Sequence, residues 1–204
     1  REDVHGGGEA APIAIRADGW RIVSHGQFWL SPTPDAPSRG WDAAEPRVAT
    51  WARVVSRAGG GRLLVVGTHF DHRGVEARAE SARQIRDWMR GEARPGEAQI
   101  LLGDFNTEAT RLADLSPTLR DARKVTATTP AGPPGTFNGF DYGRRPAAAI
   151  DHIFVSPELS VTSYAVVEQT TAGRLISDHY PVVADVLART MCRATRHEPG
   201  APTF

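Results

Sequence analysis

One short stretch of the chain combines an apolar run with side chains that could do chemistry. Residues 100–103 read Ile-Leu-Leu-Gly, and Asp104 and Asn106 follow, two positions apart. In an extended chain this spacing places both side chains on the same face. A carboxylate and a carboxamide at the end of a buried strand are costly unless they are used, which favours a functional site. The same residue types are also typical of a turn after a strand, so the stretch alone leaves both readings open.

Three further polar clusters border apolar runs elsewhere in the chain. The first follows its run, as Asp104 does, whereas the other two precede theirs. If the later strands run antiparallel to the earlier ones, all of these clusters meet at one edge of a sheet. The clusters are Thr68-His69, Asp151 and Asp178-His179.

The resulting set of side chains suits a hard divalent cation and an anionic substrate. Oxygen ligands suit Mg²⁺, Mn²⁺ or Ca²⁺, and imidazoles transfer protons near neutral pH. Together they fit metal-assisted hydrolysis of a phosphate ester. A hydrolase triad made of Ser177, Asp178 and His179 is excluded, because consecutive residues cannot form the relay. A zinc site built on His69 and His72 lacks further ligands.

Apolar periodicity predicts the elements that would position these groups. Residues 47–56 and 62–67 form a hairpin, and residues 98–103 form a later strand. Between them runs a helix with one apolar stripe. A strand, a helix and a strand of this length form a right-handed crossover with parallel strands, so His69 and Asp104 should share one sheet edge. The stripe consists of Val75, Ala79, Ala82, Ile85 and Met89.

The remaining segments are assigned by turn residues and alternation. Asp18-Gly19 between two strand-like runs predicts a first hairpin. Residues 125–145 are rich in Thr, Pro and Gly and are expected to form a long loop that closes over the site. The other expected elements are strands at 12–16, 20–30, 150–155, 161–168 and 180–187 (the last buried), loops at 31–46 and 170–176, and a short helix within 107–123 broken at Pro117.

Bulk composition bounds the class of protein. The 204 residues are 40% apolar and 24% charged, which is ordinary for one globular domain. A net charge of zero provides no overall attraction to nucleic acid or anionic lipid. No apolar run is long enough to cross a membrane, and the single Cys192 excludes an internal disulfide. We expect one domain over residues 1–188 and a flexible tail over 189–204.

Four sequence blocks, taken together and in this order, resemble the signature of the endonuclease/exonuclease/phosphatase family, the DNase I-like phosphoesterases. The resemblance runs from Arg1 to Leu187 and includes the Trp29-Leu-Ser31 and Gly40-Trp-Asp-Ala-Ala44 context of a bacterial branch. It implies an α+β fold, a four-layer α/β/β/α sandwich of two mixed β-sheets. The blocks are Gly67-Thr-His69, Gly103-Asp-Phe-Asn106, Ile150-Asp-His-Ile-Phe-Val-Ser156 and Ser177-Asp-His-Tyr-Pro-Val182.

The resemblance also implies a cofactor, Mg²⁺ or Mn²⁺, and a role for each matching residue. Asp104 would orient or activate the attacking water and contact the metal, and Asp178 would ligate the metal. Asp151 would orient His179, which would contact the phosphate or transfer a proton. Two further roles complete the expected set: Asn106 holds the phosphate or the nucleophile, and His69 contacts the phosphate or acts as an acid.

Substrate contacts are expected from the loops. Asn138, Arg174 and Trp41 are candidates, and each could instead be an ordinary loop residue or anchor. The partner would be a phosphate ester, whether in nucleic acid, a phospholipid head group or a small phosphodiester, bound to a monomer. An enzyme fold that binds without turnover is the alternative. His152 should point away from Asp151 on its strand, and Asp71 could cap the following helix.

The resemblance further implies an N-terminal strand with an Asn and a strand that ends in Gln-Glu, whose Glu is a principal metal ligand. Neither lies in this sequence, and neither Glu2 nor Glu9 has a basis for that role. We therefore expect the chain to lack the N-terminal strands of the sandwich and to bind metal weakly.

Overall fold

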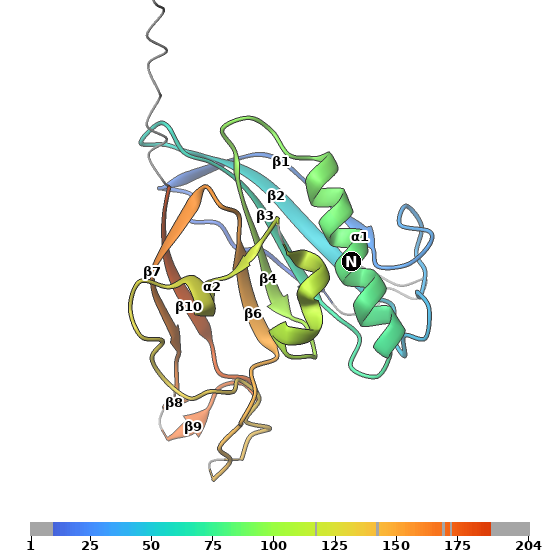
Figure 1. The fold of residues 1–204 in the computed structure, drawn as a ribbon, viewed down its shortest axis with the longest axis vertical. Coiled ribbons are helices and arrows are strands. Elements are labelled where there is room, and N and C mark those ends of the chain that lie inside the picture. The colour runs from blue at the N-terminus through green and yellow to red at the C-terminus, as the bar shows by residue number, and fades with distance from the viewer. Residues whose placement is uncertain (1–9, 117, 142, 169, 172, 189–204) are drawn as a thin grey trace, which may run out of the picture.

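A six-stranded mixed sheet forms the body of the molecule in the computed structural model (Figure 1). The structure describes residues 10–116, 118–141, 143–168, 170, 171 and 173–188. The sheet has the order β1-β2-β3-β4-β6-β5. Its strands are β1 (Trp20–Trp29), β2 (Val48–Ser56), β3 (Arg62–His69), β4 (Ala98–Asp104), β5 (Arg120–Asp121) and β6 (Asp151–Val155).

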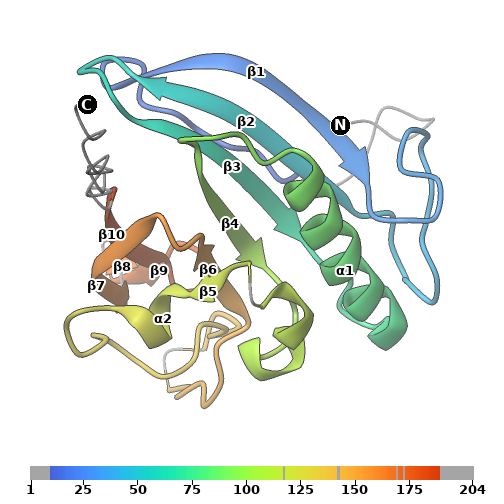
Figure 2. The same ribbon diagram turned by 45° about the horizontal axis from the view of Figure 1, so that its top comes forward.

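The predicted hairpin and crossover are both confirmed. β2 and β3 pair antiparallel across the glycine-rich turn, and β3 and β4 pair parallel. Helix α1 (Val75–Gly91) connects them and lies across the sheet (Figure 2). β6 runs antiparallel to β4, which brings Asp151 at the start of β6 to the sheet edge where Asp104 ends β4. The end of β3, the end of β4 and the start of β6 therefore lie side by side.

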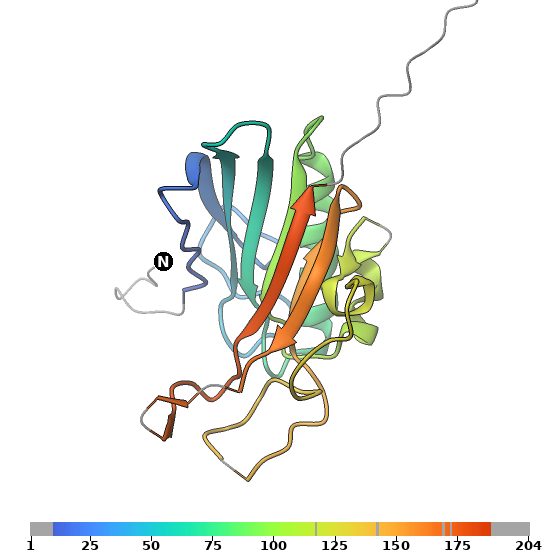
Figure 3. The same ribbon diagram turned by 90° about the vertical axis from the view of Figure 1, so that its left-hand side faces the viewer.

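Two apolar clusters hold layers against opposite faces of the sheet. Helix α1 and the 3₁₀ helix η1 (Ala109–Leu115) cover one face, where Leu64, Ile85 and Leu101 are buried together. On the other face, a two-stranded sheet of β7 (Leu159–Val166) and β10 (Val182–Ala188) packs with α2 (Ala122–Val125) around Val155 and Tyr164. Figure 3 shows β10 and β7 side by side in front of the larger sheet. The fold is thus an α+β sandwich, as predicted.

The segment before β1 differs from the prediction. Residues 12–16 form no strand, and β1 instead pairs with β2. The turn at Asp18 does form, because Trp20 N donates to Arg16 O at 3.0 Å. The chain before this turn crosses the sheet instead of pairing with β1: a Cβ on Gly67 would lie 3.2 Å from the side chain of Ile13. The side chain of Ile13 packs against the backbone of Gly67, which has no side chain of its own. This contact explains why the stretch is apolar without being a strand.

Three smaller predictions also need correction. The buried face of α1 includes Ala77 and Ser81, whereas Val75 is 65% exposed at the helix start. The last strand is half exposed, since Val183 and Leu187 on β10 face away from the core. The expected loop 170–176 contains a short hairpin of β8 (Thr170–Thr171) and β9 (Arg174–Leu175).

Several expectations concern residues that the structure does not describe. These are the break at Pro117, the tail 189–204, and Glu2 and Glu9. Within the described residues, no helix has the length and apolar character needed to cross a membrane.

Candidate active site

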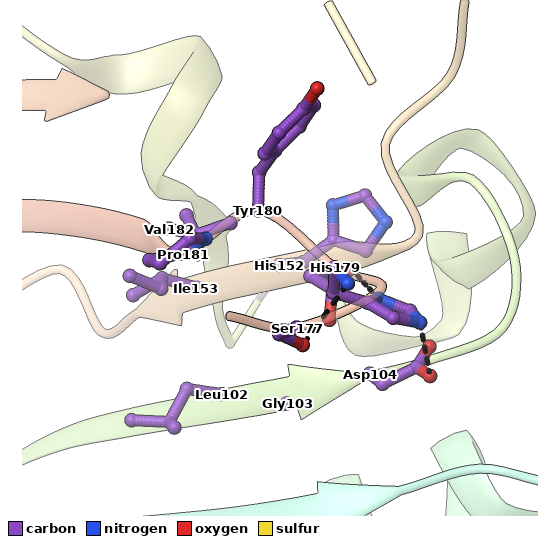
Figure 4. A pocket seen from close by; sticks show the side chains of 11 residues that line it. Leu102, Gly103, Asp104, His152, Ile153, Ser177, His179, Tyr180, Pro181 and Val182 are labelled. Atoms are coloured by element: carbon purple, nitrogen blue, oxygen red, sulfur yellow. Dashed lines mark hydrogen bonds and ion pairs between the residues drawn. The ribbon is translucent and has the colours of Figure 1, made fainter. Parts of the chain in front are cut away.

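Register between three strands brings the polar clusters together. His69 at the end of β3 is the partner of Asp104 at the end of β4, and Asp104 is the partner of Asp151 at the start of β6. His179 comes from the loop before β10, and its ring points toward Asp104 (Figure 4). Residues that are far apart in sequence thus meet at one sheet edge, as expected from the strand directions.

Asp104 lies between two imidazoles. Its Oδ2 is 3.3 Å from Nε2 of His69 and 3.9 Å from Nε2 of His179, while its Oδ1 accepts a hydrogen bond from Asn106 N at 2.7 Å. Burial and the negative charge of Asp151 raise the pKa of Asp104. A carboxylate with a raised pKa is a stronger base, so this position suits proton transfer.

Asp151 and His179 form a short polar contact in the site. Nδ1 of His179 lies 2.7 Å from Oδ2 of Asp151, and this hydrogen bond raises the pKa of His179 against the opposing effect of burial. A proton on Nδ1 donates to Asp151, which leaves Nε2 facing Asp104. This contact fixes the orientation of the imidazole, and the catalytic role of Asp151 stays a prediction.

Asn106 and Asp178 lie at the margins of this cluster. Asn106 has a φ of +49°, and its Nδ2 donates to Phe70 O at 2.9 Å, so the residue joins the ends of β4 and β3. Asp178 lies outside the cavity lining, and its Oδ1 accepts a weak hydrogen bond from Ser177 Oγ at 3.4 Å. Metal ligation by Asp178 remains a prediction.

A cavity of about 390 Å³ opens beside the cluster, within the range of small-molecule sites. Its walls combine the apolar side chains of Leu102, Ile153 and Val182 with Asp104 and His179. In Figure 4 the ring of His152 lies on the opposite side of β6 from Asp104. His152 is buried, with Nε2 2.9 Å from Thr107 O, so its role is in packing.

Asn138 does not occupy a position that a substrate could reach. It is fully buried, its Nδ2 donates to Ser177 O at 3.2 Å, and its Oδ1 accepts from Phe140 N at 2.8 Å. This differs from its predicted role as a substrate contact. The carboxamide instead fastens the loop around 137–141 to the segment that carries His179.

Sequence reasoning missed a residue beside Asn138. The ring of Phe137 lies 5.1 Å from the ring of His179, centroid to centroid, and the two residues form an isolated β-bridge. Phe137 belongs to the Thr-Phe-Asn stretch of the long loop, so a signal existed in the sequence. Only the three-dimensional pairing shows that the aromatic side chain covers the imidazole.

The loop before β2 caps helix α1. Asp42 accepts hydrogen bonds from Ala77 N at 2.7 Å and Glu76 N at 3.3 Å. Its neighbour Trp41 has a φ of +49°, an uncommon conformation for a large residue. Trp41 is half-buried and outside the cavity lining, and Arg174 is exposed on β9. Substrate contact by Trp41 or Arg174 remains a prediction.

Asp71 anchors the turn that carries His69. Only 2% exposed, it accepts hydrogen bonds from the backbone of Gly74 at 2.7 Å, Arg73 at 2.9 Å and Glu45 at 3.0 Å. Nε of the buried Arg47 is 3.7 Å from its carboxylate. Burial alone would raise the pKa of Asp71, but these backbone hydrogen bonds outweigh it and lower the pKa well below its usual range.

Replacing Asp71 with Asn should lower the free energy of unfolding by about 2–4 kcal/mol at pH 7, because charge-assisted hydrogen bonds and a buried ion pair are lost. A lowered folded-state pKa stabilises the fold above the unfolded pKa of about 4, and this stabilisation is lost as pH falls. The difference between the two proteins should therefore shrink below about pH 4. Urea denaturation followed by tryptophan fluorescence measures both effects.

The exposed Asp35 provides a matched control for this experiment. Asp35→Asn should change the free energy of unfolding by less than about 0.5 kcal/mol. An Asp71→Asn penalty that stays constant from neutral to acid pH would contradict the assigned role of the carboxylate charge.

The donor set fits a divalent cation. Within the described part of the chain, Asp104, Asp151 and His179 form a group whose ligand atoms all lie within 4.8 Å of one another. Two carboxylates and an imidazole suit Mg²⁺, Mn²⁺ or Zn²⁺. The edge of the sheet could therefore hold one metal ion, with Asp104 common to this group and to the predicted metal site.

A sandwich with acidic and imidazole groups at one sheet edge is what the resemblance to the DNase I-like phosphoesterases implied. The chain matches the Endonuclease/Exonuclease/phosphatase family over residues 16–179. It belongs to this family of hydrolytic phosphoesterases. No curated protein sequence shows a significant match to the chain.

Solved structures show the same relationship. A mannosyl-6-phosphatase of Bacteroides thetaiotaomicron is 36% identical with a TM-score of 0.80, over 84% of this chain and 68% of that chain. A Bacteroides vulgatus member of the family is 34% identical with a TM-score of 0.76, over 85% and 68%. D. rerio TDP2 in complex with a single-strand DNA product is 16% identical with a TM-score of 0.60, over 85% and 71%, and shows the fold alone.

Proposed function

We propose that the protein is a divalent-metal-dependent phosphoesterase that hydrolyses a small phosphorylated sugar. The observation that carries this proposal is the position of Asp104 between His69 and His179, with Asp151 behind His179. The 36% identity to a mannosyl-6-phosphatase supports a sugar phosphate as the substrate class. A net charge of zero argues against nucleic acid as the main substrate.

Each side chain has a role in the proposed reaction. Asp104, which lies between the two imidazoles, orients a water molecule and accepts its proton. The water oxygen bonds to phosphorus while the bond from phosphorus to the sugar oxygen breaks. Protonated His69 gives its proton to the leaving sugar oxygen, and His179, held by Asp151, binds a phosphoryl oxygen through Nε2. The products are inorganic phosphate and the free sugar.

A metal ion bound at Asp104 would offset the negative charge on the phosphoryl oxygens. We propose Asp104 as the shared ligand, with Mg²⁺ or Mn²⁺ as the ion. Asp151 and His179 lie within reach of the same ion, and Asp178 is the further predicted ligand.

Release of inorganic phosphate from mannose 6-phosphate should require added Mg²⁺ or Mn²⁺. Excess EDTA should lower the rate to background, and fresh metal should restore it. Mn²⁺ should also raise the melting temperature of the protein, because an ion that binds only the folded state stabilises it. Thermal denaturation measures this binding without any turnover.

Two outcomes would contradict this proposal in different ways. Hydrolysis that survives EDTA would indicate a metal-independent hydrolase. A folded protein that binds Mn²⁺ and sugar phosphate but releases no inorganic phosphate would indicate a binding module with this fold.

A further inference from the structure

The long loop after α2 carries an exposed arginine, Arg144, over the aromatic ring that contacts His179. We propose that Arg144 forms a subsite for an anionic group, a second phosphate or a carboxylate, on the leaving-group part of the substrate. The inference rests on the proposed phosphoesterase function and adds a substrate preference to it. We call residues 137–141 and 143–145 the arm.

The backbone fixes the arm to the segment that carries His179. Asn138 N and Gly139 N both donate to Asp178 O, at 2.8 and 3.0 Å, and Tyr180 N donates to Thr136 O at 2.7 Å. The buried side chain of Asn138 adds its bond to Ser177 O. The start of the arm is therefore held in register with the catalytic histidine.

A stack of three side chains extends from His179 along the arm. The ring of Phe137 contacts the ring of His179, and the guanidinium carbon of Arg144 lies 4.7 Å from the centroid of the Phe137 ring. A cation over an aromatic face is a favourable arrangement. Arg144 is thus separated from the imidazole by one aromatic ring.

Gly139 makes room for this stack. Its φ is +64°, and a Cβ at this position would lie 3.1 Å from Nη1 of Arg144 and 3.4 Å from the Phe137 ring. A larger residue would therefore suffer both backbone strain and crowding against the guanidinium. The backbone of the arm is shaped to hold Arg144 over Phe137.

The charge of Arg144 is available to a ligand. Its neighbour Arg145 lies 3.8 Å from Glu168, and Oδ1 of Asp141 accepts a hydrogen bond from Gly143 N. Among the described residues, no carboxylate lies within ion-pairing distance of Arg144, which is exposed. A guanidinium that stacks through its face keeps its N–H edge free for bidentate bonds to phosphate or carboxylate.

The position of the arm beside His179 determines which part of the substrate would lie near Arg144. With the scissile phosphate at Asp104 and His179, the sugar must extend away from the cluster, and the arm borders His179. A sugar with a second acidic group could then place that group at Arg144. Phosphate and carboxylate both present anionic oxygens that a guanidinium can bind. The test therefore includes both groups.

The test compares three substrates: glucose 6-phosphate, glucose 1,6-bisphosphate and 6-phosphogluconate. Wild-type protein should show a kcat/KM at least about 10-fold higher for one or both of the doubly acidic substrates, mainly through KM, since a charge-assisted contact gives 10- to 100-fold. Arg144→Ala should bring this ratio close to one, and Arg144→Lys should retain part of it. Arg145→Ala is the matched control and should keep the wild-type ratio.

A wild-type ratio near one for both acidic substrates, or a ratio that persists in Arg144→Ala, would overturn the subsite. Calorimetric binding of the same three compounds to the protein in excess EDTA, where no hydrolysis is expected, repeats the comparison without turnover. If no substrate is hydrolysed but the acidic compounds still bind more tightly through Arg144, the proposed function fails while the subsite stands.

Discussion

Asp104→Asn should lower kcat for a sugar phosphate by roughly 10²–10⁴-fold at saturating Mg²⁺ or Mn²⁺, the usual contribution of a general base. The amide cannot accept a proton from water, and it is a poor metal ligand. The substitution preserves shape, and the hydrogen bond from Asn106 N can still be accepted by the new side chain. The loss should therefore appear in turnover and not in folding.

The same variant should be at least as thermally stable as the wild type without metal. Burial and the charge of Asp151 raise the pKa of Asp104, so the ionised carboxylate destabilises the folded state above its unfolded pKa. Removing that charge removes the repulsion. Lost turnover together with an unchanged or raised melting temperature is the pattern expected where function is favoured at the expense of stability.

Stabilisation by Mn²⁺ tests separately whether Asp104 is a metal ligand. The ion should raise the melting temperature of the wild type more than that of Asp104→Asn. Asp114→Asn is the control, because Asp114 is a carboxylate on η1 that pairs with Arg83. Turnover within about threefold of wild type in Asp104→Asn would show that the chemistry lies elsewhere.

Local pattern was sufficient to predict the central β3–α1–β4 unit. Apolar residues recur with the period of a strand or a helix because one face of the element is buried. This pattern can be recognised from residues that are close together in the sequence. Crossover geometry then placed His69 beside Asp104, and strand direction placed Asp151 opposite Asp104. The candidate site could be assembled from the sequence because its residues occupy strand ends, where topology fixes position.

Contacts between loops could not be predicted in this way. The burial of Asn138 and the stack of Arg144, Phe137 and His179 depend on how a long loop folds back, which no short-range period encodes. Residues 12–16 match a strand pattern without forming a strand, because apolar residues that cross a sheet resemble residues that pair within it. Val75 belongs to the apolar stripe but is exposed, because a helical stripe does not show where the helix begins.

The glycine of the Gly-Asp-Phe-Asn block has a structural role that a sequence pattern does not explain. Gly103 has a φ of +148°, and it faces Thr68 across the parallel β3–β4 pair. A Cβ at Gly103 would collide with the backbone oxygen of Thr68 and would lie 2.9 Å from its carbonyl carbon. Because backbone cannot move aside as a side chain can, the two strands would have to separate.

Gly103→Ala should therefore lower the free energy of unfolding by about 3 kcal/mol or more, or prevent folding. Gly96→Ala is the matched control: it also has a positive φ, +73°, but has no neighbour within 4 Å of the added Cβ. Strain alone should cost Gly96→Ala about 1–2 kcal/mol. Equal penalties for the two variants in urea denaturation would contradict the role of close strand approach.

A folded fraction of Gly103→Ala would show what the approach does for the site. Separation of β3 from β4 moves His69 away from Asp104, and these side chains are 3.3 Å apart in the structure. Turnover by this fraction should fall, whereas Gly96→Ala should keep wild-type turnover because Gly96 lies in the turn before β4, at the opposite end of that strand from Asp104. The glycine thus couples the register of the two central strands to the geometry of the catalytic carboxylate.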